Sequence, residues 1–110
     1  MMADILILYY SVNESTKNMG RLIARGVETI DGANAILRTV SDKVNKENQS
    51  DPLVEINDLK NCSGLILGSP THFGNMAAPL KAFIDQTTSE WFNGTLANKP
   101  AGVFTSTSSL

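Results

Sequence analysis

A nearly continuous apolar run near the amino terminus is the feature that most constrains the fold. Residues 3–10 read Ala-Asp-Ile-Leu-Ile-Leu-Tyr-Tyr. A strand with one wet face alternates polar and apolar residues, whereas a continuous run indicates a strand that is covered on both faces. The run is too short to span a bilayer, and it lacks the basic segment of a signal peptide. We therefore expect a central strand of a parallel sheet in a soluble, cytoplasmic protein.

Strand and helix patterns alternate along the rest of the chain. A polar loop after the first run leads into a helix with an apolar face and an Asp31-Gly32 end; that face comprises Met19, Leu22, Ile23, Val27 and Ile30. Further strands are predicted at residues 35–40, 64–68 and 101–105. A short helix is expected over residues 54–59, and Ser41 to Pro52 reads as an exposed loop. Pro79 fits the first turn of another helix, whose apolar face is Met76, Leu80, Phe83 and Ile84.

This alternation predicts an α/β fold with right-handed crossovers, in which helices cover both faces of a parallel sheet. At 110 residues the chain fits one domain. Its net charge is −2 and its Lys and Arg residues form no stripe, so we expect neither nucleic acid nor a membrane as a partner. Cys62 is the only cysteine and His72 the only histidine, which argues against a disulfide and a metal site. We expect Cys62 to be a buried core residue.

Ligands of such sheets bind at the carboxyl ends of the strands, where this sequence has three polar loops. The first, Ser11 to Thr16, opens a helix, and unpaired N–H groups there favour an anion such as phosphate. Simple helix capping is the alternative. The second, Ser69 to Asn75, joins proline, an aromatic ring, glycine and asparagine, a set that suits a flat heterocycle. The third is Thr105 to Leu110.

The sequence resembles the WrbA family of flavodoxin-like NAD(P)H:quinone oxidoreductases. The resemblance extends over essentially the whole chain, and its most specific motif is Gly-Ser-Pro-Thr-His-Phe-Gly-Asn-Met at residues 68–76. Tyr-Tyr-Ser at residues 9–11, Phe-Ile-Asp-Gln-Thr at 83–87, and the segment from Trp91 to Thr107 also match. The family implies a flavodoxin-like three-layer sandwich, FMN as cofactor, NADH or NADPH as electron donor, quinones as substrates, and a homo-oligomer, either a dimer or a tetramer.

The resemblance also implies site residues. The FMN phosphate would be held by Ser11, Val12, Asn13, Glu14, Ser15 and Thr16. The isoalloxazine would be lined by Pro70, Thr71, His72, Phe73, Gly74 and Asn75, and approached by Ser106, Thr107, Ser108 and Ser109. Trp91, which we expect near the surface before an Asn-Gly turn, would flank the pocket for nicotinamide and quinone. No catalytic side chain is predicted, because the flavin itself carries the electrons.

Two features separate this chain from the family pattern. Many relatives have glycine at the position of Glu14, and a carboxylate beside a phosphate is unfavourable unless it points to solvent or meets a cation. The family also continues beyond the Ser-Thr-rich turn, so we expect residues 1–110 to be the N-terminal portion of the domain, with about four strands and an open edge that favours self-association. The alternatives to a quinone reductase are a one-electron flavodoxin-type carrier and a non-catalytic remnant that only self-associates.

Overall fold

The computed structural model describes residues 2–12, 14–41, 51–72 and 74–107. Its strands are β1 (Ala3–Tyr9), β2 (Ala33–Thr39), β3 (Gly64–His72), β4 (Asn75–Met76) and β5 (Ala101–Ser106). Its helices are α1 (Ser15–Glu28), α2 (Ile56–Asn61), α3 (Ala78–Asp85) and α4 (Thr88–Phe92). The predicted α/β class is confirmed, and the bounds of β1, β2, α2 and β5 lie within two residues of those predicted.

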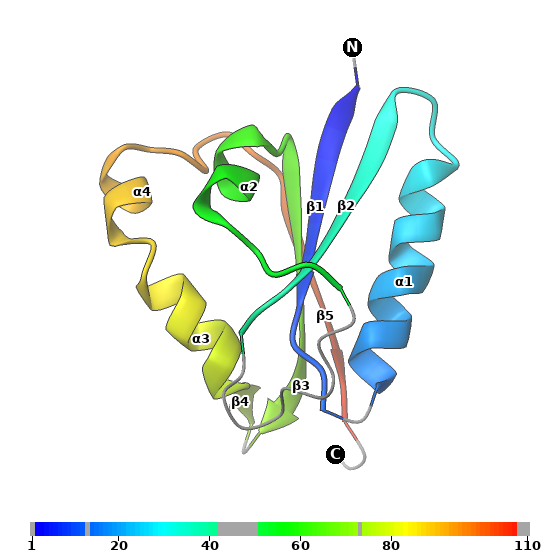
Figure 1. The fold of residues 1–110 in the computed structure, drawn as a ribbon, viewed down its shortest axis with the longest axis vertical. Helices are drawn as coiled ribbons and strands as arrows, with labels where there is room; N and C mark the ends of the chain where they lie inside the picture. Colours follow the sequence, from blue (N-terminus) through cyan, green and yellow to red (C-terminus); the bar gives the residue numbers. More distant parts are fainter. Residues whose placement is uncertain (1, 13, 42–50, 73, 108–110) are drawn as a thin grey trace.

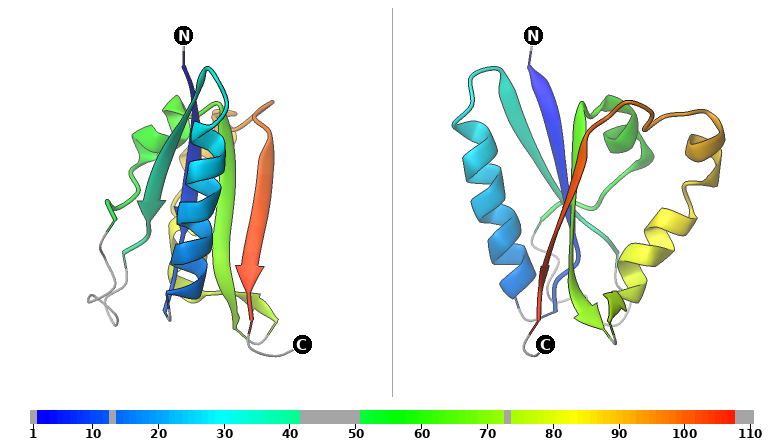
Figure 2. Two further views of the ribbon diagram at one scale, coloured as in Figure 1. Left: turned by 90° about the vertical axis from the view of Figure 1, so that its right-hand side faces the viewer. Right: turned by 180° about the vertical axis from the view of Figure 1, so that it is seen from behind.

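The sheet has the strand order β2-β1-β3-β5, with all of these strands parallel, and β4 adds a short antiparallel pairing at the end of β3. Helix α1 lies on one face of the sheet, whereas α2, α3 and α4 lie on the other (Figure 1). The right-hand view of Figure 2 shows the same three layers, and the left-hand view shows α1 in front of the sheet. This arrangement brings the carboxyl ends of all four parallel strands to one edge, the lower edge in Figure 1.

The core is centred on β1. Leu6, Ile7, Leu8 and Tyr9 are each no more than 1% exposed. Because α1 covers one face of β1 and the α2–α3 layer covers the other, both sets of alternating side chains are buried, which explains the continuous apolar run. Cys62 is buried as predicted, and burial raises the pKa of its thiol above the ordinary range. Among the described residues, every helix is too short or too polar to cross a bilayer.

The second predicted loop is largely a hairpin, which corrects the sequence prediction. Strand β3 continues to His72 instead of ending at Gly68, and β4 pairs back onto it, with Thr71 opposite Met76. Gly74 has φ of +77° in the turn between them, a conformation that favours glycine. Met76 therefore belongs to β4 and is 39% exposed, so it is not part of the apolar face of α3.

The sheet-facing stripe of α1 is narrower than predicted. Leu22 and Ile30 are 62% and 61% exposed, whereas Gly20 is buried. A Cβ atom on Gly20 would lie 3.6 Å from both the Phe104 and the Tyr9 ring. The missing side chain thus lets the helix approach the sheet along the line of Gly20, and Leu22, two residues further along the helix, turns away from that line.

Candidate functional site

Hydroxyl groups from distant segments join the three predicted loops at the carboxyl edge of the sheet. Thr16 Oγ1, in the first turn of α1, lies 3.0 Å from Ser106 Oγ at the end of β5. Thr105 Oγ1 donates to the Ser69 carbonyl oxygen at 2.7 Å and lies 3.0 Å from Thr71 Oγ1. Since the single Thr105 proton is already donated, Thr71 is the donor in that pair. The loops are therefore in mutual contact, as the α/β topology predicts.

The first loop holds a buried hydroxyl without a partner. Ser11 is 7% exposed, and its Oγ is buried with no hydrogen-bond partner among the described residues. An unsatisfied buried hydroxyl costs roughly 1–3 kcal/mol in desolvation. Such a group in a folded protein needs an explanation, and a ligand that accepts or donates a hydrogen bond at this position provides one.

Helix α1 begins beside Ser11 without a side-chain cap. Its N-cap residue is Glu14, whose side chain makes no capping hydrogen bond within the part of the chain described. The Glu14 side chain therefore does not cap the helix, which was the alternative for the first loop. The backbone N–H groups of the first turn can still bind an anion. Glu14 also has φ of 67°, in the left-handed region, which explains why glycine suits this position.

Glu14 meets a cation, one of the two conditions stated for a carboxylate near a phosphate. Lys17 Nζ lies 3.9 Å from Glu14 Oε1, and the Glu14 side chain is 64% exposed. The Lys17 side chain is only 10% exposed, although lysine is seldom this buried. Sequence reasoning missed Lys17, because a lysine in the first helical turn has the pattern of an ordinary solvated residue.

A cavity of about 410 Å³ lies between β3, β4, β5 and α3. This volume is within the usual range for small-molecule sites. Pro70, Thr71, Gly74 and Asn75 are the predicted site residues that line it. The other lining residues are Leu67, Gly68, Ser69, Met76, Leu80, Val103, Phe104 and Thr105. The cavity thus combines the polar strand ends with an apolar floor.

Most of the remaining predicted site residues lie at the protein surface or outside the described part of the chain. His72 and Thr107 are exposed, Ser15 is exposed on the first turn of α1, and Val12 is half-buried. Asn75 Oδ1 accepts a hydrogen bond from the Met76 amide at 2.8 Å. Four predicted residues lie outside the described part of the chain: Asn13, Phe73, Ser108 and Ser109.

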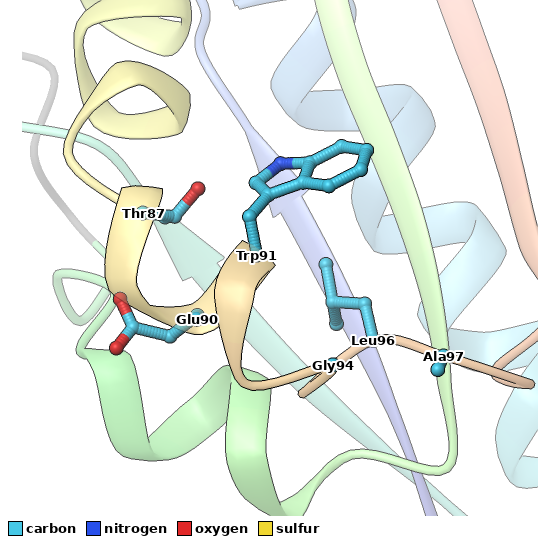
Figure 3. A pocket seen from close by; sticks show the side chains of 6 residues that line it. All are labelled: Thr87, Glu90, Trp91, Gly94, Leu96 and Ala97. Atoms are coloured by element: carbon cyan, nitrogen blue, oxygen red, sulfur yellow. The ribbon is translucent and has the colours of Figure 1, made fainter.

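Trp91 is not brought to the strand ends within this chain. It is 75% exposed, as predicted, and it lies on α4, at the opposite end of α3 from β4 (Figure 1). There it lines a separate cavity of about 240 Å³, the α4 pocket, formed by Thr87, Glu90, Trp91, Gly94, Leu96 and Ala97. Figure 3 shows the indole extending past Leu96, while the Glu90 carboxylate points the other way.

A second polar cluster, partly buried and also missed by sequence reasoning, holds the connection between β2 and α2 against β1 and α1. The Tyr9 hydroxyl donates to Asp51 Oδ2, and Arg21 Nη2 lies 3.3 Å from Asp51 Oδ1. Burial, and then the hydrogen bond to Asp51, raise the pKa of Tyr9 well above its ordinary value. Asp51 thereby links the end of β1 to the second turn of α1, close to the first loop.

Comparison with known proteins decides the family. Residues 4–110 match the family described as NADPH-dependent FMN reductase. The chain belongs to the NADPH-dependent FMN reductase family. This membership and the structural matches below confirm the flavodoxin-like fold, and they support the resemblance to WrbA-type proteins.

Solved structures similar to this FMN reductase family member share its topology. A flavodoxin, WrbA-like protein from Agrobacterium tumefaciens is 25% identical with a TM-score of 0.80, covering 98% of this chain and 62% of its own. A flavodoxin from the domain Archaea is 17% identical with a TM-score of 0.64, covering 94% and 82%. A flavodiiron core from Synechocystis is 22% identical with a TM-score of 0.64, covering 96% and 23%. The chain thus spans 62% of the length of the WrbA-like protein.

The residues of this family member fit the FMN that the family implies. A phosphorylated flavin needs an anion site next to a partly apolar slot for its ring. The unpartnered Ser11 hydroxyl and the uncapped start of α1 provide the first, and the cavity between β3 and β5 provides the second. The Thr16–Ser106 hydrogen bond joins the first turn of α1 to the end of β5, one of the strands that border the cavity.

Proposed function

We propose that this protein is an FMN-dependent oxidoreductase that transfers two electrons from NADH or NADPH to a quinone. The observation that carries the proposal is the buried Ser11 hydroxyl, which has no partner among the described residues and lies beside an uncapped helix start. A phosphate there would satisfy both the hydroxyl and the first-turn amides. Membership of the FMN reductase family supports the same cofactor.

The residues that would hold FMN fall into two groups. Ser11, Thr16 and the amides that open α1 would bind the phosphate, together with the other first-loop residues named from the sequence. Pro70, Thr71, Gly74 and Asn75 would line the flavin ring. Phe73, Ser108 and Ser109 keep the roles that the resemblance implies, and they stay predictions.

When bound, FMN supplies the two-electron chemistry, and the chain supplies binding, orientation and exclusion of water. Thr71 and Thr105 fix β3 to β5 through their hydroxyl groups, which keeps the floor of the cavity rigid. Leu67, Leu80 and Val103 give this floor an apolar surface that favours a flat ring over water. These side chains orient the cofactor without donating or removing a proton themselves.

The substrate-binding role of Trp91 requires a second chain in this proposal. Within one chain Trp91 is part of α4, which lies away from the strand ends. In a homo-oligomer, a dimer or a tetramer, Trp91 of one subunit would flank the nicotinamide and quinone pocket of another. We expect this assembly in the cytoplasm.

A non-catalytic, self-associating role is the second candidate, and the exposure of β5 favours it. Within the described residues β5 pairs only with β3, and Val103 is 83% exposed. An uncovered strand edge without charged side chains is a template for pairing with another chain. This role predicts a stable oligomer that neither binds FMN nor oxidises NAD(P)H.

One experiment separates these possibilities. The purified chain is reconstituted with FMN, freed of excess flavin, and mixed anaerobically with NADPH or NADH before a benzoquinone is added. We expect one bound FMN per chain, bleaching of flavin absorbance by the nicotinamide, and its recovery with the quinone. Flavin binding with a reductive titration that pauses after one electron would favour the carrier, and a colourless oligomer would favour the non-catalytic role. Either result would contradict the proposal.

A further inference from the structure

We propose that Lys17 makes the strand-end site selective for a flavin with a terminal phosphate, and that Glu14 holds the Lys17 ammonium group until that phosphate binds. The inference rests on the proposed function, because it concerns the same site. It assigns a role to the i,i+3 ion pair between Glu14 and Lys17.

The side chain of Lys17 is largely buried. Because only 10% of the side chain is exposed, its aliphatic stem is packed against the protein and holds the ammonium group at the start of α1. Within the described residues its one ion pair is with Glu14 Oε1 at 3.9 Å, which is too long for a hydrogen bond. The three donors of the ammonium group are thus poorly used, although the stem of the side chain is held in place.

The position of Glu14 makes its carboxylate easy to displace. It is the N-cap of α1 but makes no capping hydrogen bond within the described residues, and it has a left-handed backbone that non-glycine residues seldom adopt. Its side chain is 64% exposed, so the carboxylate can turn into water at little cost. An ion pair with so exposed a partner is weak. Lys17 is therefore easily transferred to a stronger anion.

The charge of the ligand favours transfer of the Lys17 ammonium group from Glu14 to the phosphate. A phosphate monoester carries close to two negative charges near neutral pH and offers three acceptor oxygens. At the start of α1 it would lie near Ser11, whose buried hydroxyl has no partner among the described residues, and in the same turn as Lys17. Charge-assisted hydrogen bonds to phosphate are stronger than the existing pair. Repulsion from the phosphate would also move the Glu14 carboxylate toward solvent.

The test compares FMN with riboflavin, which has the same ring but lacks the phosphate. Dissociation constants for both are measured by flavin fluorescence on the full chain, for wild type and for Lys17→Met, Lys17→Arg and Glu14→Gln. Lys17→Met keeps an apolar stem of similar length, so the buried packing is largely retained. Lys60→Met, an exposed lysine on α2, is the matched control.

The selectivity ratio is the dissociation constant of riboflavin divided by that of FMN. We expect Lys17→Met to lower this ratio about tenfold, with riboflavin affinity unchanged, because only the phosphate contact is lost. Lys17→Arg should keep most of the ratio, and Glu14→Gln should raise it about threefold by removing a competing charge. Lys60→Met should leave it unchanged. Unchanged riboflavin affinity also shows that the variant is folded.

The outcomes separate the two proposals. If wild type binds FMN but Lys17→Met leaves the selectivity ratio unchanged, this inference is overturned and the proposed function stands. The same holds if Lys17→Met weakens both flavins equally, since that result indicates a structural role. If wild type binds neither flavin, both proposals are overturned.

Discussion

The carboxyl edge of the sheet and the α4 pocket are both concave, yet they are built differently. The edge is assembled by hydroxyl contacts between segments far apart in the chain, such as Thr16 and Ser106, 90 residues apart. The α4 pocket is formed by residues 87–97 alone, and its wall is mostly apolar. A ligand site usually combines an apolar wall with a few convergent polar groups. On this basis the carboxyl edge, rather than the α4 pocket, is the site that we propose for the cofactor.

The largest effect, on the free energy of unfolding, is expected at Gly68, where β3 packs closely against the Phe104 ring. A Cβ atom on Gly68 would lie 2.0 Å from the Phe104 ring, whereas one on Gly102 would meet nothing within 4 Å. Gly68→Ala should lower the free energy of unfolding by at least about 2 kcal/mol, because the ring must move. Gly102→Ala should leave it unchanged or slightly raised. Urea unfolding followed by circular dichroism measures both, and equal midpoints would show that the β3–β5 contact is not specific.

The next test separates binding from stability at the edge. Ser11→Ala removes a buried hydroxyl that has no partner among the described residues, so the free energy of unfolding should stay the same or rise. FMN affinity should fall about tenfold, because one hydrogen bond to a charged phosphate is lost. Ser69→Ala is the structural counterpart, since Ser69 Oγ accepts from the Ala77 amide at 2.9 Å, and it should cost about 1 kcal/mol of stability. If Ser11→Ala bound FMN as tightly as wild type, the carboxyl edge of the sheet would not be the phosphate site.

A smaller effect is expected from the Tyr9–Asp51 contact, which ties the edge to the β2–α2 connection. The raised pKa of Tyr9 means that the folded protein keeps the phenol protonated, so its contribution to stability is full below pH of about 10 and is lost as pH rises further. Tyr9→Phe should cost about 1 kcal/mol at pH 7.

Urea titrations of both proteins from pH 8 to above pH 10 measure this difference. The stability gap between wild type and Tyr9→Phe should narrow at the alkaline end, because wild type alone loses the Tyr9 contribution there. A gap that widened with pH would contradict the assigned protonation.

The smallest effect is expected for a substitution in the α4 pocket, measured as a change in FMN affinity. Trp91 is 75% exposed and lies away from the strand ends, so Trp91→Ala should leave FMN affinity within about twofold of wild type. Equilibrium titration with FMN at a concentration where the chain is monomeric measures this directly. A tenfold loss would show that the α4 pocket shares in cofactor binding and would break the comparison.

The sequence predicted the parts of the fold that local pattern determines. The run at 3–10 predicted β1, because burial on both faces leaves a direct mark on composition. The extension of β3 through Pro70 to His72 was missed, because Ser-Pro-Thr-His has the composition of a loop. Pairing of Pro70 with Ser106 of β5 decided its structure. Leu22 was predicted to lie on the buried face of α1 but is exposed, because helical periodicity does not specify which line of the helix faces the sheet.

The same division applies to the site. The three loops and their edge followed from α/β topology, and the resemblance supplied the motif that includes Thr71 and Gly74. The contacts that join the loops could not be predicted, because Thr16 and Ser106 give no sign in the sequence that they meet. The burial of Lys17 and the Tyr9–Asp51 hydrogen bond likewise exist only in the folded chain.

The most direct test of the central claim is the location of FMN on the folded chain. Amide chemical shifts in two-dimensional NMR spectra of the labelled protein are recorded as FMN is added. We predict the largest shifts at residues 11–16, 69–75 and 105–107, and smaller shifts at residues 87–97. Shifts concentrated at residues 87–97, or no saturable shifts at the three strand ends, would contradict the account.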